Sequence, residues 1–356
     1  MIANHPISGP TFLAAYLLTL VLSGGIAYTT IVFLKGDSRL AKLIHTQVNT
    51  GKPGVVSFGG VAVMVSFFFT LWTAPYLLSL HPDYNTLFLG ITLGGALMFL
   101  LGIYDDLVVA RPWTKLVAQI AIAIGLYYFG FRIDRIGDWW ELGPLSPVVT
   151  VLWIVGISNS LNLIDGKDGL AGGLIFLSCL TLTLVYLERK IFGPSFLSVI
   201  LSGSVFGFLL FNYPPAKIIL GDTGSLPLGL IISLVTLLPL AQGFTDEIYY
   251  LIPVVTLLVP ITDTIWAFVR RVSKGISPFS RDAEHFHHRL ERLGQTPTKT
   301  IFILLGIAFY FDLWSLIPAF NINLIPKFTP IFFIFIVVHL VFLITWLRRK
   351  ERDLKS

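Results

Sequence analysis

Long apolar runs are the feature that most constrains what this sequence can fold into. A transmembrane helix needs about 20 mostly apolar residues, and eleven segments are near or above that length. They are 11–34, 56–80, 86–104, 114–130, 147–164, 170–187, 195–211, 225–242, 249–269, 300–319 and 330–347. Strands of a membrane barrel alternate in polarity and are about ten residues long, which excludes a barrel. The sequence therefore predicts an all-α, polytopic membrane protein with about eleven transmembrane helices.

Composition excludes the other broad classes of protein. Charged residues make up 13% of the chain and hydrophobic residues 55%, whereas a soluble domain carries about 25% charged residues. Disordered chains are far less apolar than this, and a single cysteine, Cys179, excludes a disulfide scaffold. The longest polar stretch, 271–299, is too short to fold alone. We therefore expect one membrane domain over residues 1–356, set in a lipid bilayer and without a nucleic-acid partner.

The positive charges predict an orientation. If eleven spans alternate, 20 of the 25 Lys and Arg residues fall on the side of the C-terminus, and this excess marks the cytoplasmic side. The first positive charge, Lys35, follows segment 11–34, so this segment lacks the basic start of a cleaved signal. We expect an N-out, C-in topology in which the inner loops form an active-site face. These loops are about 35–55, 105–113, 165–169, 212–224 and 270–299.

The first candidate motif is the pair Asp105 and Asp106 at the end of segment 86–104. Two adjacent carboxylates at a helix C-terminus repel each other and oppose the helix dipole. A Mg²⁺ ion, or a proton on a base with a raised pKa, would offset that cost. A solvated turn at the membrane edge is the alternative. Lys115, which begins the next segment, either reaches back toward a phosphate or extends to the membrane surface.

A second motif places Asn159, Asn162, Asp165 and Asp168 at intervals of three residues. On a helix this spacing forms one slowly drifting polar stripe, and the Asp-Gly steps that follow favour a turn. Amides and carboxylates on such a backbone suit a ligand with many donors and acceptors, such as a nucleoside. The alternative is a capped turn between two helices.

A third motif surrounds Asp222, which two glycines and two hydroxyl residues flank in the segment 221–225. The motif precedes segment 225–242, and the N-terminus of a helix presents free N–H groups to an anion. A carboxylate there can hold a Mg²⁺ ion that bridges phosphates. An ordinary N-cap is the alternative.

A fourth motif contains His285, His287 and His288, followed by Arg289. Phosphate binding by histidine and arginine suits this cluster, whereas zinc lacks a supporting cysteine or His-Glu-x-x-His pattern. A basic loop attracted to anionic lipid is a further alternative for the arginines nearby. Asp263 lies inside the apolar segment 249–269, where a carboxylate is a functional candidate or has a structural role.

Together, and in this order, the four motifs resemble the polyprenyl-phosphate N-acetylhexosamine-1-phosphate transferases. The resemblance covers nearly the whole chain, from Lys52-Pro53 and Gly59-Gly60 to Leu293-Gly294. The segment 285–290 is similar to the His-x-His-His-Arg form of the UDP-GlcNAc branch (WecA/TagO-like). Two departures are Ile219, where members often have a phenylalanine that can stack on the base, and the absence of the usual Pro-Arg pattern before Gly59-Gly60.

The resemblance implies roles for individual residues. Asp105 and Asp106 would be the catalytic pair, and Asp222 with Asp106 would hold Mg²⁺, with Mn²⁺ as a substitute. Further positions would bind the substrates: Asn159, Asn162, Asp165 and Asp168 the nucleoside, and Lys115, His285, His287, His288 and Arg289 the phosphates or the sugar. Lys52 and Asp263 are additional candidates.

The implied reaction joins UDP-GlcNAc and undecaprenyl phosphate to give undecaprenyl-diphospho-GlcNAc and UMP. This would be the first membrane step of lipid-linked glycan synthesis, at the cytoplasmic face of a bacterial inner membrane, with a homodimer as one candidate assembly. The alternative within this class is a phospho-MurNAc-pentapeptide transferase. A different class, an ion-coupled transporter, would place its polar residues near the bilayer midplane, whereas here they gather at the inner ends of the segments.

Overall fold

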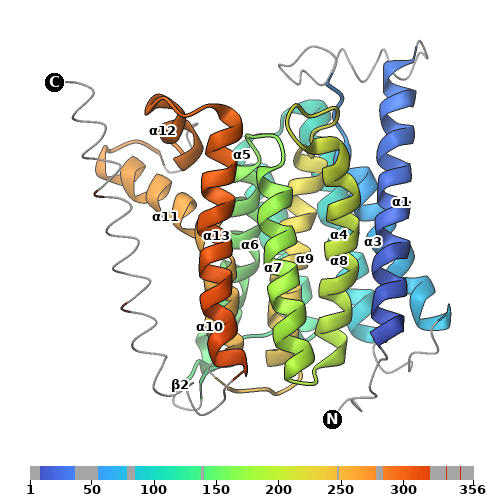
Figure 1. Cartoon of the computed structure of the whole chain (residues 1–356). Coiled ribbons are helices and arrows are strands. Elements are labelled where there is room, and N and C mark those ends of the chain that lie inside the picture. Colours follow the sequence, from blue (N-terminus) through green and yellow to red (C-terminus); the bar gives the residue numbers. More distant parts are fainter. Residues whose placement is uncertain are drawn as a thin grey trace.

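The computed structural model of the chain describes residues 9–36, 55–77, 85–137, 140–246, 248–277 and 284–320, and the single residues 334 and 345. In these ranges the chain forms a bundle in which most helices run roughly along one direction (Figure 1). The helices are α1 (Gly9–Lys35), α3 (Gly59–Leu77), α4 (Asn85–Val108), α5 (Pro112–Tyr128), α6 (Ser146–Ile164), α7 (Leu170–Glu188), α8 (Phe192–Asn212), α9 (Asp222–Ala241), α10 (Ile248–Thr256), α11 (Leu258–Ser273), α12 (Phe286–Arg292) and α13 (Pro297–Phe320).

The chain is a multi-pass membrane protein. Among the described residues, seven helices are long and apolar enough to cross a membrane, and the pair α10 and α11 makes eight if it counts as one broken span. Ten of the eleven predicted segments lie on helices, while segment 330–347 lies almost wholly outside the described residues. The total of eleven spans and the N-out, C-in orientation stay predictions.

The prediction of one continuous span over 249–269 is wrong, because α10 and α11 meet at 72°. Pro260 explains the break: it has no N–H to donate to the carbonyl of Thr256, four residues earlier, and proline disrupts a helix except near its start. The side chain of Ser178, on α7, instead donates a hydrogen bond of 2.8 Å to that carbonyl. The bend turns α11 away from the bundle (Figure 1).

Helix α9 lies at the centre of the bundle, packed against α3, α4 and α6. Two glycines allow the close approach at its first turn. A Cβ at Gly102, on α4, would collide with the backbone of Asp222, and a Cβ at Gly60, on α3, would collide with the backbone of Gly224. These contacts place the end of α4 directly on the beginning of α9.

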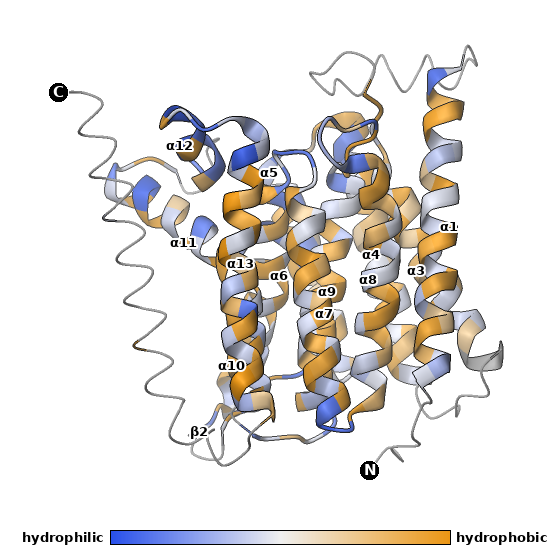
Figure 2. Cartoon of the chain, viewed as in Figure 1, coloured by the Kyte–Doolittle hydropathy of each residue, from blue (hydrophilic) through white to orange (hydrophobic). Residues whose placement is uncertain are grey.

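The two ends of the bundle differ in polarity. Hydrophilic residues gather at the end that carries α12, whereas the sides of the bundle are largely apolar (Figure 2). The opposite end holds a small antiparallel pair, β1 (Arg135–Ile136) and β2 (Trp140–Glu141), followed by the short 3₁₀ helix η2 (Gly143–Leu145). Within the described residues, the all-α prediction is correct apart from this pair and one isolated bridge, between Val56 and Ile218. We call the end with α12 the site end.

Candidate functional site

Four helices bring charged and amide side chains together at the site end. Lys115 of α5 donates hydrogen bonds to Asp105 of α4, at 2.7 Å, and to Asp222 of α9. Asn162 of α6 donates to the second oxygen of Asp222, at 2.7 Å. We call Asp105, Lys115, Asn162 and Asp222 the carboxylate centre. Residues from four separate stretches of the sequence thus form one cluster.

Lys115 owes its place to the start of its helix. Pro112 occupies the first position of α5, where a missing N–H costs nothing. A cation in the first turn of a helix is unfavourable, because the dipole is positive there. Asp105 and Asp222 offset this cost, and the remaining oxygen of Asp105 accepts a hydrogen bond of 2.7 Å from the backbone N–H of Ala110. The ammonium group therefore neutralises two carboxylates that would otherwise repel each other.

Asp106 caps a helix that is not its own. Its carboxylate accepts hydrogen bonds from the backbone N–H of Asp222 at 3.0 Å and of Thr223 at 2.9 Å, and from the Thr223 hydroxyl at 2.5 Å. The two backbone donors are among the free N–H groups at the start of α9, which ordinarily need a cap. The two adjacent aspartates therefore have different surroundings, and the role of Asp106 as a metal ligand stays a prediction.

The loop 165–169 joins the carboxylate centre to its surroundings. Gly221 donates a backbone hydrogen bond to Asp165, and desolvation, followed by the charges of Asp222 and Asp106, raises the pKa of Asp165 well above its usual value. Asp168 accepts a hydrogen bond of 3.2 Å from the backbone of Ala216. In this structure the two aspartates thus hold the chain segment that leads into α9.

Asn159 has a partner that the sequence analysis missed. Its amide donates to the side-chain oxygen of Gln119 at 2.7 Å, and Gln119 donates back at 3.4 Å. Gln119 is fully buried. It lies four residues after Lys115, on the same face of a helix, and this spacing is the signal that could have identified it.

The histidine segment is held from the side by α11. Asp263 accepts a hydrogen bond of 2.8 Å from the backbone N–H of Phe286, and its other oxygen lies 2.8 Å from Nδ1 of His285. Asp263 therefore caps the start of α12 and orients one histidine. We call Asp263, His285, His287 and His288 the histidine arm. These contacts are those expected of a structural role for Asp263, and its functional role stays a prediction.

His287 has unused hydrogen-bonding capacity. Its side chain is buried, at 1% exposure, and neither ring nitrogen has a hydrogen-bond partner within the described part of the chain. A Cβ on Gly166 would lie 3.1 Å from its Nε2, so the ring faces the loop 165–169. Burial, followed by the influence of His288, lowers the pKa of His287 to about 3. His287 is therefore a neutral group near pH 7.

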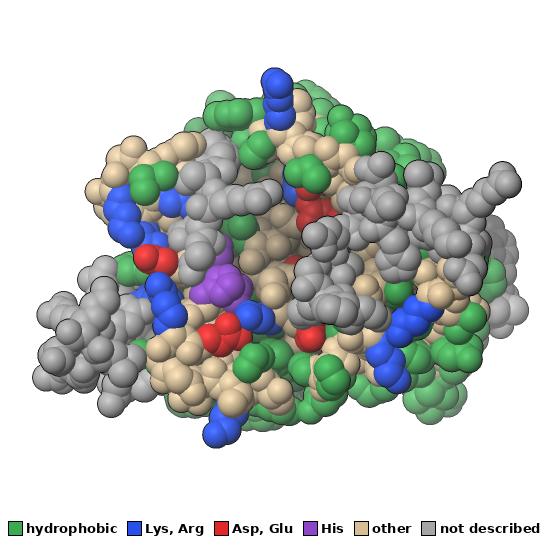
Figure 3. Space-filling view, turned by 90° about the horizontal axis from the view of Figure 1, so that it is seen from above, with side chains coloured by type: hydrophobic (Ala, Val, Ile, Leu, Met, Phe, Trp, Pro, Cys, Tyr) green, Lys and Arg blue, Asp and Glu red, His purple; other side chains and the backbone are tan. Residues whose placement is uncertain are grey.

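Two ion pairs complete the surroundings of the histidine arm. Lys167, in the loop 165–169, lies 2.8 Å from Glu291 of α12, and Arg270 of α11 lies 3.1 Å from Glu284. Arg289 is buried within α12. Seen from the site end, the histidines border a hollow whose rim also carries acidic and basic side chains (Figure 3).

The donor set suits magnesium chemically. Mg²⁺ is bound through one or two carboxylates together with substrate phosphates and water, and Asp105 and Asp222 supply two carboxylates around one cationic group. Among the described residues, no group of three or more His, Cys, Asp or Glu side chains is placed to hold a metal by itself. The protein oxygens therefore fit a cation that the substrate helps to bind. Lys52 lies outside the described residues.

Comparisons with known proteins agree with this arrangement. Residues 88–240 match glycosyl transferase family 4. A probable undecaprenyl-phosphate N-acetylglucosaminyl 1-phosphate transferase of Bacillus subtilis is 32% identical over 86% of this chain and 83% of its own length. An undecaprenyl-phosphate alpha-N-acetylglucosaminyl 1-phosphate transferase of Thermotoga maritima is 32% identical over 72% of this chain and 78% of its own.

A relative with another substrate covers less of the chain. A phospho-N-acetylmuramoyl-pentapeptide-transferase of Levilactobacillus brevis is 33% identical over 52% of this chain and 62% of its own length. The similarity to the N-acetylglucosaminyl enzymes thus extends further along the sequence. The chain belongs to glycosyl transferase family 4, among the polyprenyl-phosphate phosphoglycosyltransferases that its four motifs resemble.

Proposed function

We propose that this protein transfers GlcNAc-1-phosphate from UDP-GlcNAc to undecaprenyl phosphate and releases UMP. The observation that carries the proposal is the carboxylate centre, in which Lys115 joins Asp105 to Asp222 at the site end. The names of the B. subtilis and T. maritima relatives support the substrates. The site then lies at the cytoplasmic face of a bacterial inner membrane, within reach of a soluble donor and a lipid acceptor.

The reaction exchanges one phosphorus–oxygen bond for another. An oxygen of the lipid phosphate forms a bond to the phosphorus that carries the sugar, and the bond from this phosphorus to the bridging oxygen breaks. UMP leaves with the electron pair of the broken bond. Both reactants are anions, so the protein must reduce their mutual repulsion and hold them in line.

In this proposal Asp222 would hold Mg²⁺ with Asp105 in place of the expected Asp106, because the carboxylate of Asp106 already accepts three hydrogen bonds at the start of α9. The ion would supply charge neutralisation when bound. Lys115 already lies between the carboxylates of Asp105 and Asp222, and its ammonium group would turn to a phosphate of the substrate. Asp105 would accept the proton if the lipid phosphate binds protonated. Asp106 would keep the first turn of α9 in place through its three hydrogen bonds.

The remaining side chains would bind the donor. Asn159, Asn162, Asp165 and Asp168 line the path from α6 into the loop 165–169 and would contact the nucleoside. His287 has two free ring nitrogens within the described structure, and together with His288 and Arg289 it would contact the diphosphate or the sugar. His285 would act through its bond to Asp263.

The test is UMP release by purified protein supplied with UDP-GlcNAc, undecaprenyl phosphate and Mg²⁺. We expect release that depends on the lipid and that is lost both with EDTA and in Asp222→Asn. Release that persists in the presence of EDTA would contradict the role of the metal. The absence of release with any UDP-sugar, from a well-folded preparation, would contradict the proposed reaction.

A second donor has a specific observation in its favour, because the L. brevis relative is named for phospho-N-acetylmuramoyl-pentapeptide transfer. The same assay with UDP-MurNAc-pentapeptide separates the two. Release with this donor alone would keep the chemistry at the carboxylate centre and overturn GlcNAc as the transferred sugar. We expect release with UDP-GlcNAc alone.

A direct, single-step transfer is part of the proposal. In the alternative, Asp222 would attack first and form a phospho-enzyme, which the lipid phosphate would then resolve. Rapid quenching of a single turnover with labelled donor distinguishes the two routes. We expect no labelled protein, and a labelled Asp222 that forms and decays at the rate of turnover would overturn the direct route.

A further inference from the structure

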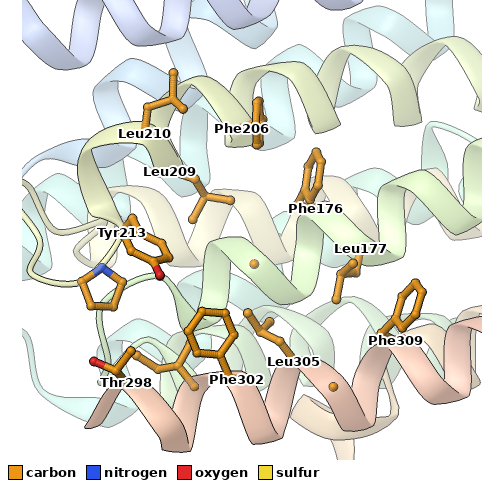
Figure 4. Close-up of a pocket in the computed structure, with 15 residues that line it drawn as sticks. Phe176, Leu177, Phe206, Leu209, Leu210, Tyr213, Thr298, Phe302, Leu305 and Phe309 are labelled. Atoms are coloured by element: carbon orange, nitrogen blue, oxygen red, sulfur yellow. The ribbon is translucent and has the colours of Figure 1, made fainter.

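An apolar groove lies between α7, α8 and α13, with a volume of about 630 Å³. Figure 4 shows side chains from these helices facing it, among them Phe176, Phe206, Leu209, Phe302 and Leu305. Small-molecule sites usually enclose about 300 to 1,000 Å³. The groove is therefore large enough to hold a flexible apolar chain.

Two glycines shape the wall of the groove in different ways. A Cβ at Gly173, on α7, would meet Leu305 at 2.8 Å, so α7 and α13 approach closely there. At Gly306, on α13, a Cβ would meet nothing within 4 Å. A larger side chain at Gly306 would therefore enter the groove without disturbing the packing of the helices.

The groove faces lipid and not the core. Leu210, Phe302 and Phe309 line it, and each is more than half exposed on a helix of membrane-spanning length. In a bilayer, such side chains contact acyl chains. The occupant is therefore a chain that enters from the side, out of the membrane.

The end of the groove nearest the site end is more polar than the rest, and two lysines follow its lining residues in the sequence. Tyr213 and Thr298 line this end (Figure 4). Lys217 and Lys299 follow them closely in the sequence, and both are exposed. Lysines beside a membrane attract anionic headgroups. An apolar groove with cationic groups at one end matches the charge pattern of an anionic phospholipid.

We infer that this groove binds one acyl chain of an anionic phospholipid, with its phosphate near Lys217 and Lys299. The acceptor lipid is a poorer match, because none of the residues that line the groove belongs to α4, α5, α6 or α9, which carry the carboxylate centre. The inference goes beyond the proposed reaction and does not depend on it. The bound lipid would join α13 to α7 and α8.

The test measures the melting temperature of the full chain in detergent micelles during titration with phosphatidylglycerol, or with phosphatidylcholine of the same chains. We expect phosphatidylglycerol to raise the melting temperature at concentrations at least tenfold lower. Gly306→Leu should abolish most of this rise. Gly125→Leu is the matched control, because a Cβ at Gly125 on α5 also meets nothing within 4 Å, and this variant should respond as the wild type does.

The charge is tested by the double variant Lys217→Gln, Lys299→Gln. We expect it to respond equally to the two lipids, since the groove is intact and only the preference for an anion is lost. An undiminished response to phosphatidylglycerol in Gly306→Leu would overturn the proposal. So would displacement of phosphatidylglycerol by undecaprenyl phosphate, or a wild-type dimer that Gly306→Leu converts to a monomer, because each assigns the groove to another occupant.

Discussion

The carboxylate centre and the histidine arm lie at the same end of the molecule but differ in how far their polar groups are satisfied. In the carboxylate centre, Lys115 bonds to Asp105 and to Asp222, and Asn162 bonds to Asp222. In the histidine arm, His285 is bonded to Asp263, whereas His287 has no hydrogen-bond partner within the described residues.

This difference indicates that the two regions would bind a ligand in different ways. The carboxylate centre is held together by its own charges, so a substrate or metal has to replace bonds that already exist. A buried group without a partner costs free energy, and His287 is placed so that a ligand can remove that cost. Substitutions in the carboxylate centre should therefore lower both turnover and stability. Substitutions in the histidine arm should lower mainly turnover, through weaker contacts with the ligand.

The largest effect is expected from Asp222→Asn in the carboxylate centre. The variant removes one charge from the pair that neutralises Lys115 and weakens the proposed cation site. Lipid-dependent UMP release should fall by about 10²–10³-fold or more, the range seen when a group that stabilises developing charge is removed. Asp246→Asn, at an exposed carboxylate outside the site, is the control. Turnover in Asp222→Asn within threefold of the wild type would refute the assignment.

The next effect concerns stability. Lys115→Met leaves Asp105 and Asp222 without the ammonium group that joins them. The three side chains are 14–26% exposed, so the loss should exceed the about 0–1 kcal/mol of a solvent-exposed pair but stay below the about 3–5 kcal/mol of a fully buried one. We expect a clear fall in melting temperature together with loss of turnover. Arg135→Met provides the comparison, because Arg135 pairs with Glu141 at the opposite end of the bundle and these side chains are 44% and 74% exposed. An equal fall in melting temperature in the two variants would show that the ion pairs of Lys115 stabilise the fold no more than an ordinary surface ion pair does.

The sequence was enough to predict that the site residues gather at one end of the bundle, because the patterns that indicate this lie within each segment. Polar residues at the ends of apolar segments, together with the positive-charge count, are enough to predict that Asp105, Asn162, Asp222 and the histidines share one face. The pairing of Asp106 with the start of α9 was not predictable, since it depends on Gly102 and Gly60 admitting a close approach between helices.

The bend between α10 and α11 and the bond from Asp263 to His285 were not fully predictable for the same reason. Pro260 is the sequence signal for the bend between α10 and α11, but the carbonyl that it leaves without a donor is satisfied by Ser178 of another helix, which no sequence pattern indicates. The link from Asp263 to His285 joins residues 22 apart in the sequence, one on α11 and the other just before α12. Sequence patterns identify which residues are polar within a span, and only tertiary packing decides which of them meet.

A smaller effect is expected at Asp263. Asp263→Asn keeps an oxygen for the N–H of Phe286 but loses the charge beside His285, whereas Asp263→Ala loses both contacts. We expect kcat to fall about tenfold in the first variant and up to about 100-fold in the second, the range for groups that orient a ligand-binding side chain. Thr262→Val, at the neighbouring position, should change kcat little.

A double-variant measurement separates positioning from a general loss of fold. If Asp263 acts through the histidines, adding His288→Ala to Asp263→Ala should cost less than His288→Ala costs in the wild type, because residues in one network are not additive. Strict additivity, or a melting temperature that falls in step with kcat, would indicate that Asp263 only holds the fold.

The smallest effect is a pH dependence that belongs to the histidine arm. Burial holds the pKa of His287 at about 3, below the usual value near 6.5 of an unfolded histidine. Between these values the unfolded chain binds a proton that the folded protein does not, so stability falls as the pH falls below about 6.5. Because other groups also titrate with acid, the quantity to measure is the difference in melting temperature between pH 7 and pH 5, compared across variants.

His287→Gln should show a smaller fall in melting temperature between pH 7 and pH 5 than the wild type, because the group that resists protonation is gone. His288→Gln is the matched control: the pKa of His288 is also lowered, by desolvation first and then by Lys167, but the side chain is partly exposed, so its contribution is smaller. If His287→Gln and the wild type lose equal stability, His287 has a partner for its proton in the folded protein. The contrast between the two regions would then be wrong, because it depends on His287 having no hydrogen-bond partner in the histidine arm while the groups of the carboxylate centre bond to one another.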